Sequence, residues 1–235
     1  MAGLYCGTSG FAYPTWKPGF YPEKLPAAKF LQHYATRLNA VESNYTFRRL
    51  LTESVAAKWI NETPENFRFA VKAHQRITHF DRLAVSEFTE VFFRAIEPLR
   101  IKRKLGPVLV QLPPNFAIDP GKLKGFLAVV PRDIPLAFEF RNKSWFDESV
   151  YSELGSAGAS LCLAESDKLV VPEVLTAPFV YLRLRKPDYT PAERVEIAQR
   201  VAELKEKCAE VYLFFKHEET PSGALYAEEI LAQAG

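Results

Sequence analysis

The stretch IPLAFEFRNKSWFDESVYSELGSAGASLCLAES, Ile134 to Ser166, has the pattern of a strand, a helix and a second strand. The apolar runs at 134–142 and 159–166 are short and end at polar or turn-forming residues, which is typical of buried strands. Residues 147–158 between them are predicted to be helical. Because strands joined through a helix usually pair in parallel, this unit predicts a parallel sheet covered by helices.

The same alternation extends in both directions from this unit. Strands are predicted at 4–9, 39–47, 67–74, 106–114, 134–142, 159–166, 177–185 and 209–217. Helices are predicted at 27–38, 50–62, 86–105, 119–131, 147–158, 190–208 and 222–233. Eight strands with helices after most of them favour an α/β fold, a (β/α)8 TIM-barrel-like closed parallel barrel, in a single domain of residues 1–235. An open doubly wound sheet is the alternative.

Composition and charge are those of an ordinary globular protein. The 235 residues are 48% hydrophobic and 25% charged, and the net charge of +2 does not by itself indicate polyanion binding. No apolar run approaches the roughly 20 residues of a membrane helix, and the first residues lack a signal-peptide pattern. Cys6, Cys162 and Cys208 are widely spaced in apolar settings, so we expect buried free thiols. We therefore expect a cytoplasmic protein that does not contact membranes.

Polar residues follow the apolar runs of the predicted strands, at the end where (β/α)8 enzymes have their active sites. We expect Glu42 and Glu139 to act as general acid or base. The expected substrate-binding residues lie at the same strand ends: Asn44, Tyr45, Lys72, Gln111, Arg141, Arg183 and Lys216. Since residues two apart in a strand share a face, Glu139 and Arg141 are expected to point together into the barrel mouth. A buried structural ion pair is the alternative for any one of these charges.

The charge of these strand ends favours an anionic ligand. Five cations, Lys72, Arg141, Arg183, Arg185 and Lys216, are expected beside the two carboxylates. We predict a hydrolase or lyase that acts on a phosphorylated or other small anionic compound, although the pattern does not require turnover. The alternative is a nucleic-acid-binding protein without turnover, based on these cations and the basic run Arg100–Leu105. Aromatic residues beyond the strand ends could stack on a base or sugar, or pack over the barrel: Tyr13, Trp16, Tyr45 and Trp145.

No cofactor is indicated by the sequence, and a metal site is not favoured. Glu42, Glu139 and Glu165 leave Mg²⁺ or Mn²⁺ as an open possibility. The strand ends offer only His74 and His217 as further ligands. The oligomeric state is left open by the sequence.

Seven motifs occur in order along the chain. They are GTSGFAYPTW…FYP (7–22), AVESNYTFRR (40–49), FRFAVKAHQRITH (67–79), LGPVLVQLPPNF (105–116), AFEFRNKSWF (137–146), VYLRLR (180–185) and VYLFFKHEETPSGAL (211–225). Together they resemble the YecE-like family, a domain of unknown function for which the resemblance implies a TIM-barrel-like fold and no established reaction. Two short segments depart from the pattern that this resemblance implies. Lys216-His217 replaces a usual pair of asparagines, and Arg185-Lys186-Pro187 replaces a segment that usually begins His-Gly.

Overall fold

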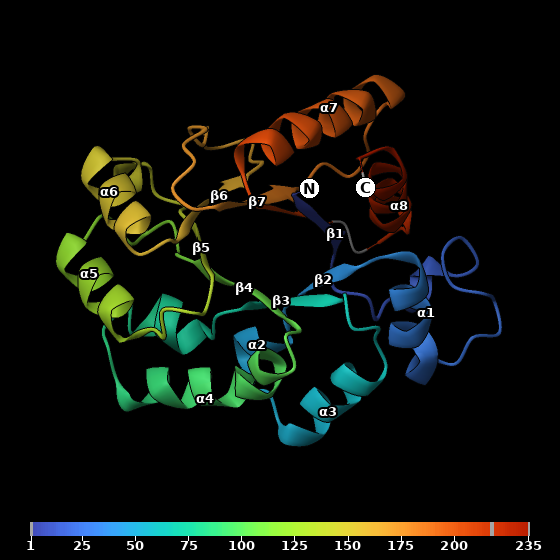
Figure 1. The fold of residues 1–235 in the computed structure, drawn as a ribbon, viewed down its shortest axis with the longest axis horizontal. Coiled ribbons are helices and arrows are strands. Elements are labelled where there is room, and N and C mark those ends of the chain that lie inside the picture. The colour runs from blue at the N-terminus through green and yellow to red at the C-terminus, as the bar shows by residue number, and fades with distance from the viewer. Residues whose placement is uncertain (1, 217–218, 235) are drawn as a thin grey trace.

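The computed structural model describes residues 2–216 and 219–234, and their strands close into a barrel (Figure 1). The strands are β1 (Gly3–Ser9), β2 (Ala40–Ser43), β3 (Arg68–Lys72), β4 (Leu105–Gln111), β5 (Leu136–Glu139), β6 (Ser160–Ala164), β7 (Phe179–Leu184) and β8 (Glu210–Phe215). All neighbours are parallel, and β1 completes the ring by pairing with β8, with Leu4 opposite Val211. The predicted (β/α)8 barrel is confirmed, and the alternative of an open sheet is wrong.

Helices follow most strands and lie outside the barrel (Figure 1). They are α1 (Phe30–Arg37), α2 (Tyr45–Arg48), α3 (Glu53–Asn61), α4 (Glu87–Ile101), α5 (Pro120–Val129), α6 (Glu148–Ser156), α7 (Pro191–Lys207) and α8 (Ser222–Ala234). The connection from β6 to β7, residues 165–178, is described throughout and contains no helix. Among the described helices, none has both the length and the apolar character needed to cross a membrane.

The barrel strands bury different side chains on their two faces. On β7, Leu182 and Leu184 pack outward in the large core between barrel and helices, whereas Tyr181 packs inside the barrel. The interior combines small residues, such as Ala40 and Ala137, with large aromatic rings. This alternation follows from the two-residue period of a strand. The three cysteines are buried free thiols, as expected.

A polar layer lies above this apolar interior at the carboxyl ends of the strands. Each of its residues follows an interior residue by two positions, in the pairs Ala40 and Glu42, Ala70 and Lys72, Leu109 and Gln111, Ala137 and Glu139, and Tyr181 and Arg183. Residues two apart lie on the same face of a strand. Because the apolar residue of each pair points into the barrel, the polar residue two positions later points into its mouth.

The joint between β1 and β2 depends on side chains as well as on the backbone ladder. The two strands pair at three positions, Gly7 to Ser9 opposite Ala40 to Glu42. The Tyr34 hydroxyl, from α1, accepts a hydrogen bond from the Thr8 N–H and donates one to the Ala40 carbonyl, both at 2.9 Å. It occupies the space beside Gly7, so the register that places Ser9 next to Glu42 requires a glycine at this position.

Candidate functional site

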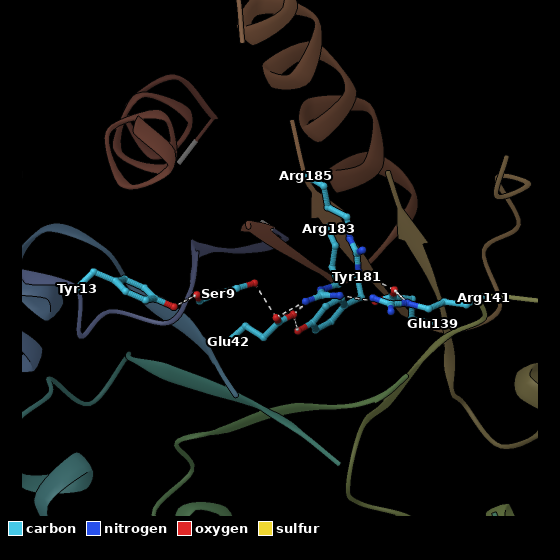
Figure 2. A network of polar contacts seen from close by, with 8 residues as sticks. All are labelled: Ser9, Tyr13, Glu42, Glu139, Arg141, Tyr181, Arg183 and Arg185. Atoms are coloured by element: carbon cyan, nitrogen blue, oxygen red, sulfur yellow. Dashed lines mark hydrogen bonds and ion pairs between the residues drawn. The ribbon is translucent and has the colours of Figure 1, made fainter. Parts of the chain in front are cut away.

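Arg183 lies between two buried carboxylates at the barrel mouth (Figure 2). Its Nε and Nη2 donate to the two carboxylate oxygens of Glu42 at 2.7 and 2.6 Å, and its Nη1 donates to Glu139. Glu42 is 0% exposed, Arg183 1% and Glu139 2%. The guanidinium therefore joins β2, β5 and β7 across the barrel, and both buried carboxylates are charge-paired.

Glu42 has a complete set of hydrogen-bond donors. Besides Arg183, the Ser9 hydroxyl donates to Oε1 at 2.6 Å and the Tyr181 hydroxyl donates to Oε2 at 2.8 Å. Burial by itself would raise the pKa of Glu42, but the Arg183 charge and these donors outweigh it and hold the pKa below its ordinary value. A carboxylate that is ionised and fully bonded at neutral pH is suited to positioning Arg183 rather than to transferring protons.

Glu139 is shared by three arginines. In addition to Arg183, Nη2 of Arg185 lies 2.7 Å and Nε of Arg141 lies 3.1 Å from its Oε1. Burial opposes ionisation, but the three guanidinium groups and a hydrogen bond from Gln111 lower the pKa of Glu139 to about 2. Glu139 and Arg141 do point the same way, as expected from their spacing. The acid–base role expected for Glu139 is less favoured, because such a low pKa makes a weak base.

The low pKa of Glu139 predicts a contribution to acid unfolding. A carboxyl group whose pKa falls from 4.5 to about 2 on folding stabilises the protein above pH 4.5, and this stabilisation disappears as the pH falls towards 2. Urea midpoints measured between pH 5 and pH 2 should therefore decline less steeply for Glu139→Gln than for the wild-type chain. Equal slopes for the two proteins would contradict the assignment.

A pocket with a cavity volume of about 320 Å³ opens beside the arginines. Its wall includes Glu139, Arg141, Glu165, Lys168 and Arg185. The side chains of Arg141 and Arg185 are 37% and 24% exposed, in contrast to the buried Arg183. Nε of Arg185 is buried and has no hydrogen-bond partner in the described part of the chain. We refer to this cavity as the arginine pocket.

The loop that carries Arg185 is held by Glu165. One carboxylate oxygen of Glu165 accepts hydrogen bonds from the backbone N–H groups of Arg185 and Lys186, at 2.6 and 3.0 Å, and from the Tyr189 hydroxyl. Glu165 is therefore engaged with the backbone after β7 and does not lie beside Glu42 as a potential metal ligand. In the ranges 2–216 and 219–234, no group of three or more His, Cys, Asp and Glu side chains has an arrangement that could hold a metal ion.

Lys72 lies at the mouth without a charged partner. Its Nζ is 4.0 Å from the centroid of the Phe47 ring, and no described residue forms a hydrogen bond or ion pair with this ammonium group. Burial lowers the pKa of Lys72, and the charges of Arg183 and Arg141 lower it further, whereas Glu42 and Glu139 raise it. The net result is a pKa of about 8.

Asn44 and Tyr45 lie in a different pocket from the arginines. This second pocket, of about 370 Å³, is lined mainly by apolar groups from the loop after β1 and from α1 and α3, including Phe11, Leu31 and Trp59. The two pockets have no lining residue in common. The helix α2 begins at Tyr45 immediately after β2, which turns these two side chains away from the barrel axis.

Gln111 and Lys216 lie at strand ends, as expected. Gln111 is opposite Glu139 in the β4–β5 register and is 3% exposed. Lys216 follows β8, and its backbone N–H donates to the Leu184 carbonyl at 2.7 Å. The neighbouring His217 lies outside the described residues. Whether Asn44, Tyr45, Lys72, Gln111, Arg141, Arg183 and Lys216 bind a substrate stays a prediction.

The aromatic residues expected near the mouth divide into two pairs. Trp16 and Trp145 are completely buried, and Trp145 donates its indole N–H to the Phe116 carbonyl at 2.8 Å. These two rings pack within the structure and have no face open to a ligand. Tyr13 and Tyr45 line the second pocket.

Several components of the site were not identified from the sequence. Phe47 belongs to the short helix α2, and Lys168 to the irregular segment after β6, so neither lies at a position that strand periodicity selects. Arg185, in contrast, was expected among the cations of the strand ends, and it lies in the pocket wall, two positions after the interior residue Arg183.

Comparison with known proteins shows relatives without an assigned activity. The chain is 32% identical over 158 residues to the UPF0759 protein YunF of Bacillus subtilis (strain 168), covering 64% of this chain and 55% of that protein. It is 27% identical over 147 residues to the UPF0759 protein YecE of Escherichia coli (strain K12), covering 61% of this chain and 50% of that protein. The chain thus spans about half the length of the curated relatives that it matches.

Solved structures show the same fold over nearly the whole chain. The crystal structure of a DUF72 family protein from Thermotoga maritima MSB8 has a TM-score of 0.84 and 27% identity, with 98% of each chain covered. A DUF72 family protein from Enterococcus faecalis V583 has a TM-score of 0.78 at 21% identity, which supports the fold alone. Residues 5–235 match the family described as "Protein of unknown function DUF72". The resemblance to YecE is thus confirmed, and the chain belongs to the DUF72 family.

Proposed function

We propose that the protein is an enzyme, a hydrolase or lyase, that acts on a small anionic substrate at the carboxyl-terminal mouth of the barrel. The observation that carries this proposal is the composition of the arginine pocket: one buried carboxylate, Glu139, is shared by three guanidinium groups. Two of these groups, on Arg141 and Arg185, form part of the pocket wall.

The balance of charge around the pocket supports an anionic ligand. Four cationic side chains, Arg141, Arg183, Arg185 and Lys72, lie around the two carboxylates of Glu42 and Glu139. A phosphate or carboxylate would offset the excess of positive charge, and its oxygens match the planar donors of arginine. Nε of Arg185, which lacks a partner in the described chain, supplies a donor that an anion could satisfy.

The burial of the charged residues supports different roles for them in this proposal. Arg141, Arg185 and Lys72 are partly accessible and would contact the substrate. Glu42, Glu139 and Arg183 are buried and would hold the accessible arginines in place as positioning residues. The location at the carboxyl ends of the strands is where enzymes of this fold have their active sites, which is support by analogy.

The nucleic-acid alternative lacks comparable support. The basic run Arg100–Leu105 does not form a continuous cationic surface: Arg100 pairs with Glu97 and Asp133. The Lys104 ammonium is buried and donates to the carbonyls of Thr63 and Pro64. This run precedes β4 and therefore lies at the end of the barrel opposite the mouth. A concave pocket also fits a small molecule better than a polymer.

Small anions are expected to raise the melting temperature of the protein. We expect a rise of about 5–10 °C once a ligand exceeds its Kd about 100-fold, because binding stabilises only the folded state. The measurement is a thermal melt at constant ionic strength with inorganic phosphate, sugar phosphates or small carboxylates. Arg185→Met should reduce the rise by about half or more, while Arg94→Met, which removes an exposed guanidinium from α4, should retain it.

The melts have two outcomes that would contradict the proposal. One is a melting temperature that no anion of the panel changes at constant ionic strength. The other is an equal rise for the wild-type chain and Arg185→Met, which would place the binding elsewhere. Stabilisation by single-stranded oligonucleotides alone, steeply weakened by salt, would favour the nucleic-acid reading instead.

A further inference from the structure

We propose that Lys72 is a nucleophile that forms an imine with the carbonyl carbon of an anionic aldehyde or ketone. This inference rests on the proposed function, because the neighbouring arginines would hold the anionic group of the substrate. It extends that function by naming a carbonyl compound as the substrate class and an amine as the reacting group.

The position of Lys72 places its amine at the barrel mouth, close enough to Arg141 and Arg183 for their charges to lower its pKa. Lys72 is the last residue of β3 and shares the interior face of that strand with Ala70. Its backbone carbonyl accepts a hydrogen bond from the Thr46 hydroxyl at 2.6 Å, which fixes the strand end. The Phe47 ring lies against the ammonium group, so the amine is partly desolvated but not enclosed.

The nearby carboxylates are already committed to other partners. The Glu42 oxygens bond to Arg183, Ser9 and Tyr181, and the Glu139 oxygens bond to arginines. No described carboxylate lies within 4.0 Å of Lys72 Nζ. Among the described residues the ammonium group therefore forms no ion pair, and it contacts the Phe47 ring.

Lys104 is a lysine of the same protein whose ammonium group has a structural role. It is 5% exposed, and its Nζ donates to the Thr63 carbonyl, the Thr63 hydroxyl and the Pro64 carbonyl at 2.7, 2.8 and 2.6 Å. The three N–H groups of this ammonium are thus each engaged in a hydrogen bond at the opposite end of the barrel. Lys72 has none of these bonds and is available for chemistry.

Burial is the main reason that a neutral amine of Lys72 is accessible near neutral pH. The charges of Arg183 and Arg141 lower its pKa further, whereas those of Glu42 and Glu139 raise it. Burial and the charge of Lys72 lower the pKa of His79, in the helical turn Arg76–Phe80. At a pKa of about 8, about a tenth of the amines are neutral at pH 7, compared with about one in three thousand at the ordinary value of 10.5. Only the neutral amine attacks a carbonyl.

The proposed step requires only the amine, the carbonyl compound and one proton from solvent. The Lys72 nitrogen bonds to the carbonyl carbon, the C=O π pair moves to oxygen, and transfer of a proton from nitrogen to oxygen gives a carbinolamine. The hydroxyl group takes up one proton from solvent and leaves as water when the C–O bond breaks, and the remaining fragment is a protonated imine. The iminium then withdraws electrons from a neighbouring C–C or C–H bond, which is the chemistry that a lyase requires.

Reductive trapping tests this step directly. The full chain is incubated with glyoxylate, the smallest anionic aldehyde, and sodium cyanoborohydride, and the products are analysed by intact mass and peptide mapping. We expect one adduct per chain, on Lys72, with a mass gain equal to glyoxylate minus one oxygen atom. The adduct should form on the order of tenfold faster than at the exposed Lys58, with a rate that rises through pH 8.

Variants and inorganic phosphate separate the possible outcomes. Lys72→Arg cannot form the imine and should lose the adduct, whereas Arg94→Met, which changes an exposed residue of α4, should retain both the adduct and the thermal response to phosphate. Adducts spread over surface lysines, or preferred at Lys104, would overturn the imine proposal. If phosphate stabilises the wild-type chain and Lys72 is not trapped, the imine proposal fails and the anion site stands. If phosphate has no effect, the proposed function fails whatever the trapping shows.

Discussion

Replacing Arg183 by Met is expected to destabilise the protein by about 3–5 kcal/mol. The substitution removes the only guanidinium that bonds to Glu42 among the described residues and one of the three that bond to Glu139. Two carboxylates that are 0% and 2% exposed would then lose a buried positive charge that offsets their desolvation. Removal of one partner from a buried ion pair typically costs this amount, because the remaining charge is left uncompensated.

Urea unfolding at pH 7 measures this effect against two controls. Arg194→Met removes a partly exposed pair with Glu229 and should cost less than about 1 kcal/mol. The double variant Arg183→Met/Glu42→Gln removes both members of the buried pair and should recover about half or more of the lost stability. A single variant within about 1 kcal/mol of the wild-type chain would show that the network does not stabilise the barrel mouth.

Gly7→Ala is expected to destabilise the protein by more than about 3 kcal/mol. A Cβ atom at this position would lie 1.9 Å from the Ala40 carbonyl oxygen and 2.6 Å from the Tyr34 hydroxyl oxygen. Neither neighbour can move independently, since Ala40 begins β2 and the Tyr34 hydroxyl bridges β1 to β2. The strands would have to separate, at a cost above the 1–3 kcal/mol typical of overpacked side chains.

Gly125→Ala provides the matched control for this substitution. Gly125 is exposed within α5, and an added Cβ would have nothing within 4 Å. Its replacement should leave stability unchanged or raise it by about 0.5–1 kcal/mol, because alanine favours helix more than glycine does. The free energy of unfolding from urea titration checks both variants, and a Gly7→Ala protein as stable as Gly125→Ala would contradict the close packing at the β1–β2 joint.

The fold was predictable because its signal lies in local periodicity. Apolar runs alternating with helical segments predicted a parallel barrel, as observed. The two-residue period of a strand predicted that Glu139 and Arg141 share a face, where they form an ion pair. These inferences need only the geometry of one strand and its neighbours.

The pairing across the barrel could not be predicted, because it joins residues far apart in the chain. Glu42 and Arg183 come from β2 and β7, and nothing in either segment indicates that they meet. The sequence also could not show that a helix begins at Tyr45, which places Asn44 and Tyr45 in the second pocket. Whether Trp16 and Trp145 stack on a ligand or pack internally was likewise decided only by tertiary contacts.

Calorimetric titration with inorganic phosphate at constant ionic strength tests most directly whether the barrel mouth is an anion site. We expect saturable phosphate binding with one site per chain for the wild-type protein and for Arg94→Met. We expect at least about tenfold weaker binding for Arg185→Met and Arg141→Met, because each loses a charged donor of the pocket wall. Absence of saturable binding by the wild-type chain, or equal affinity in Arg185→Met, would contradict an anion site in the arginine pocket.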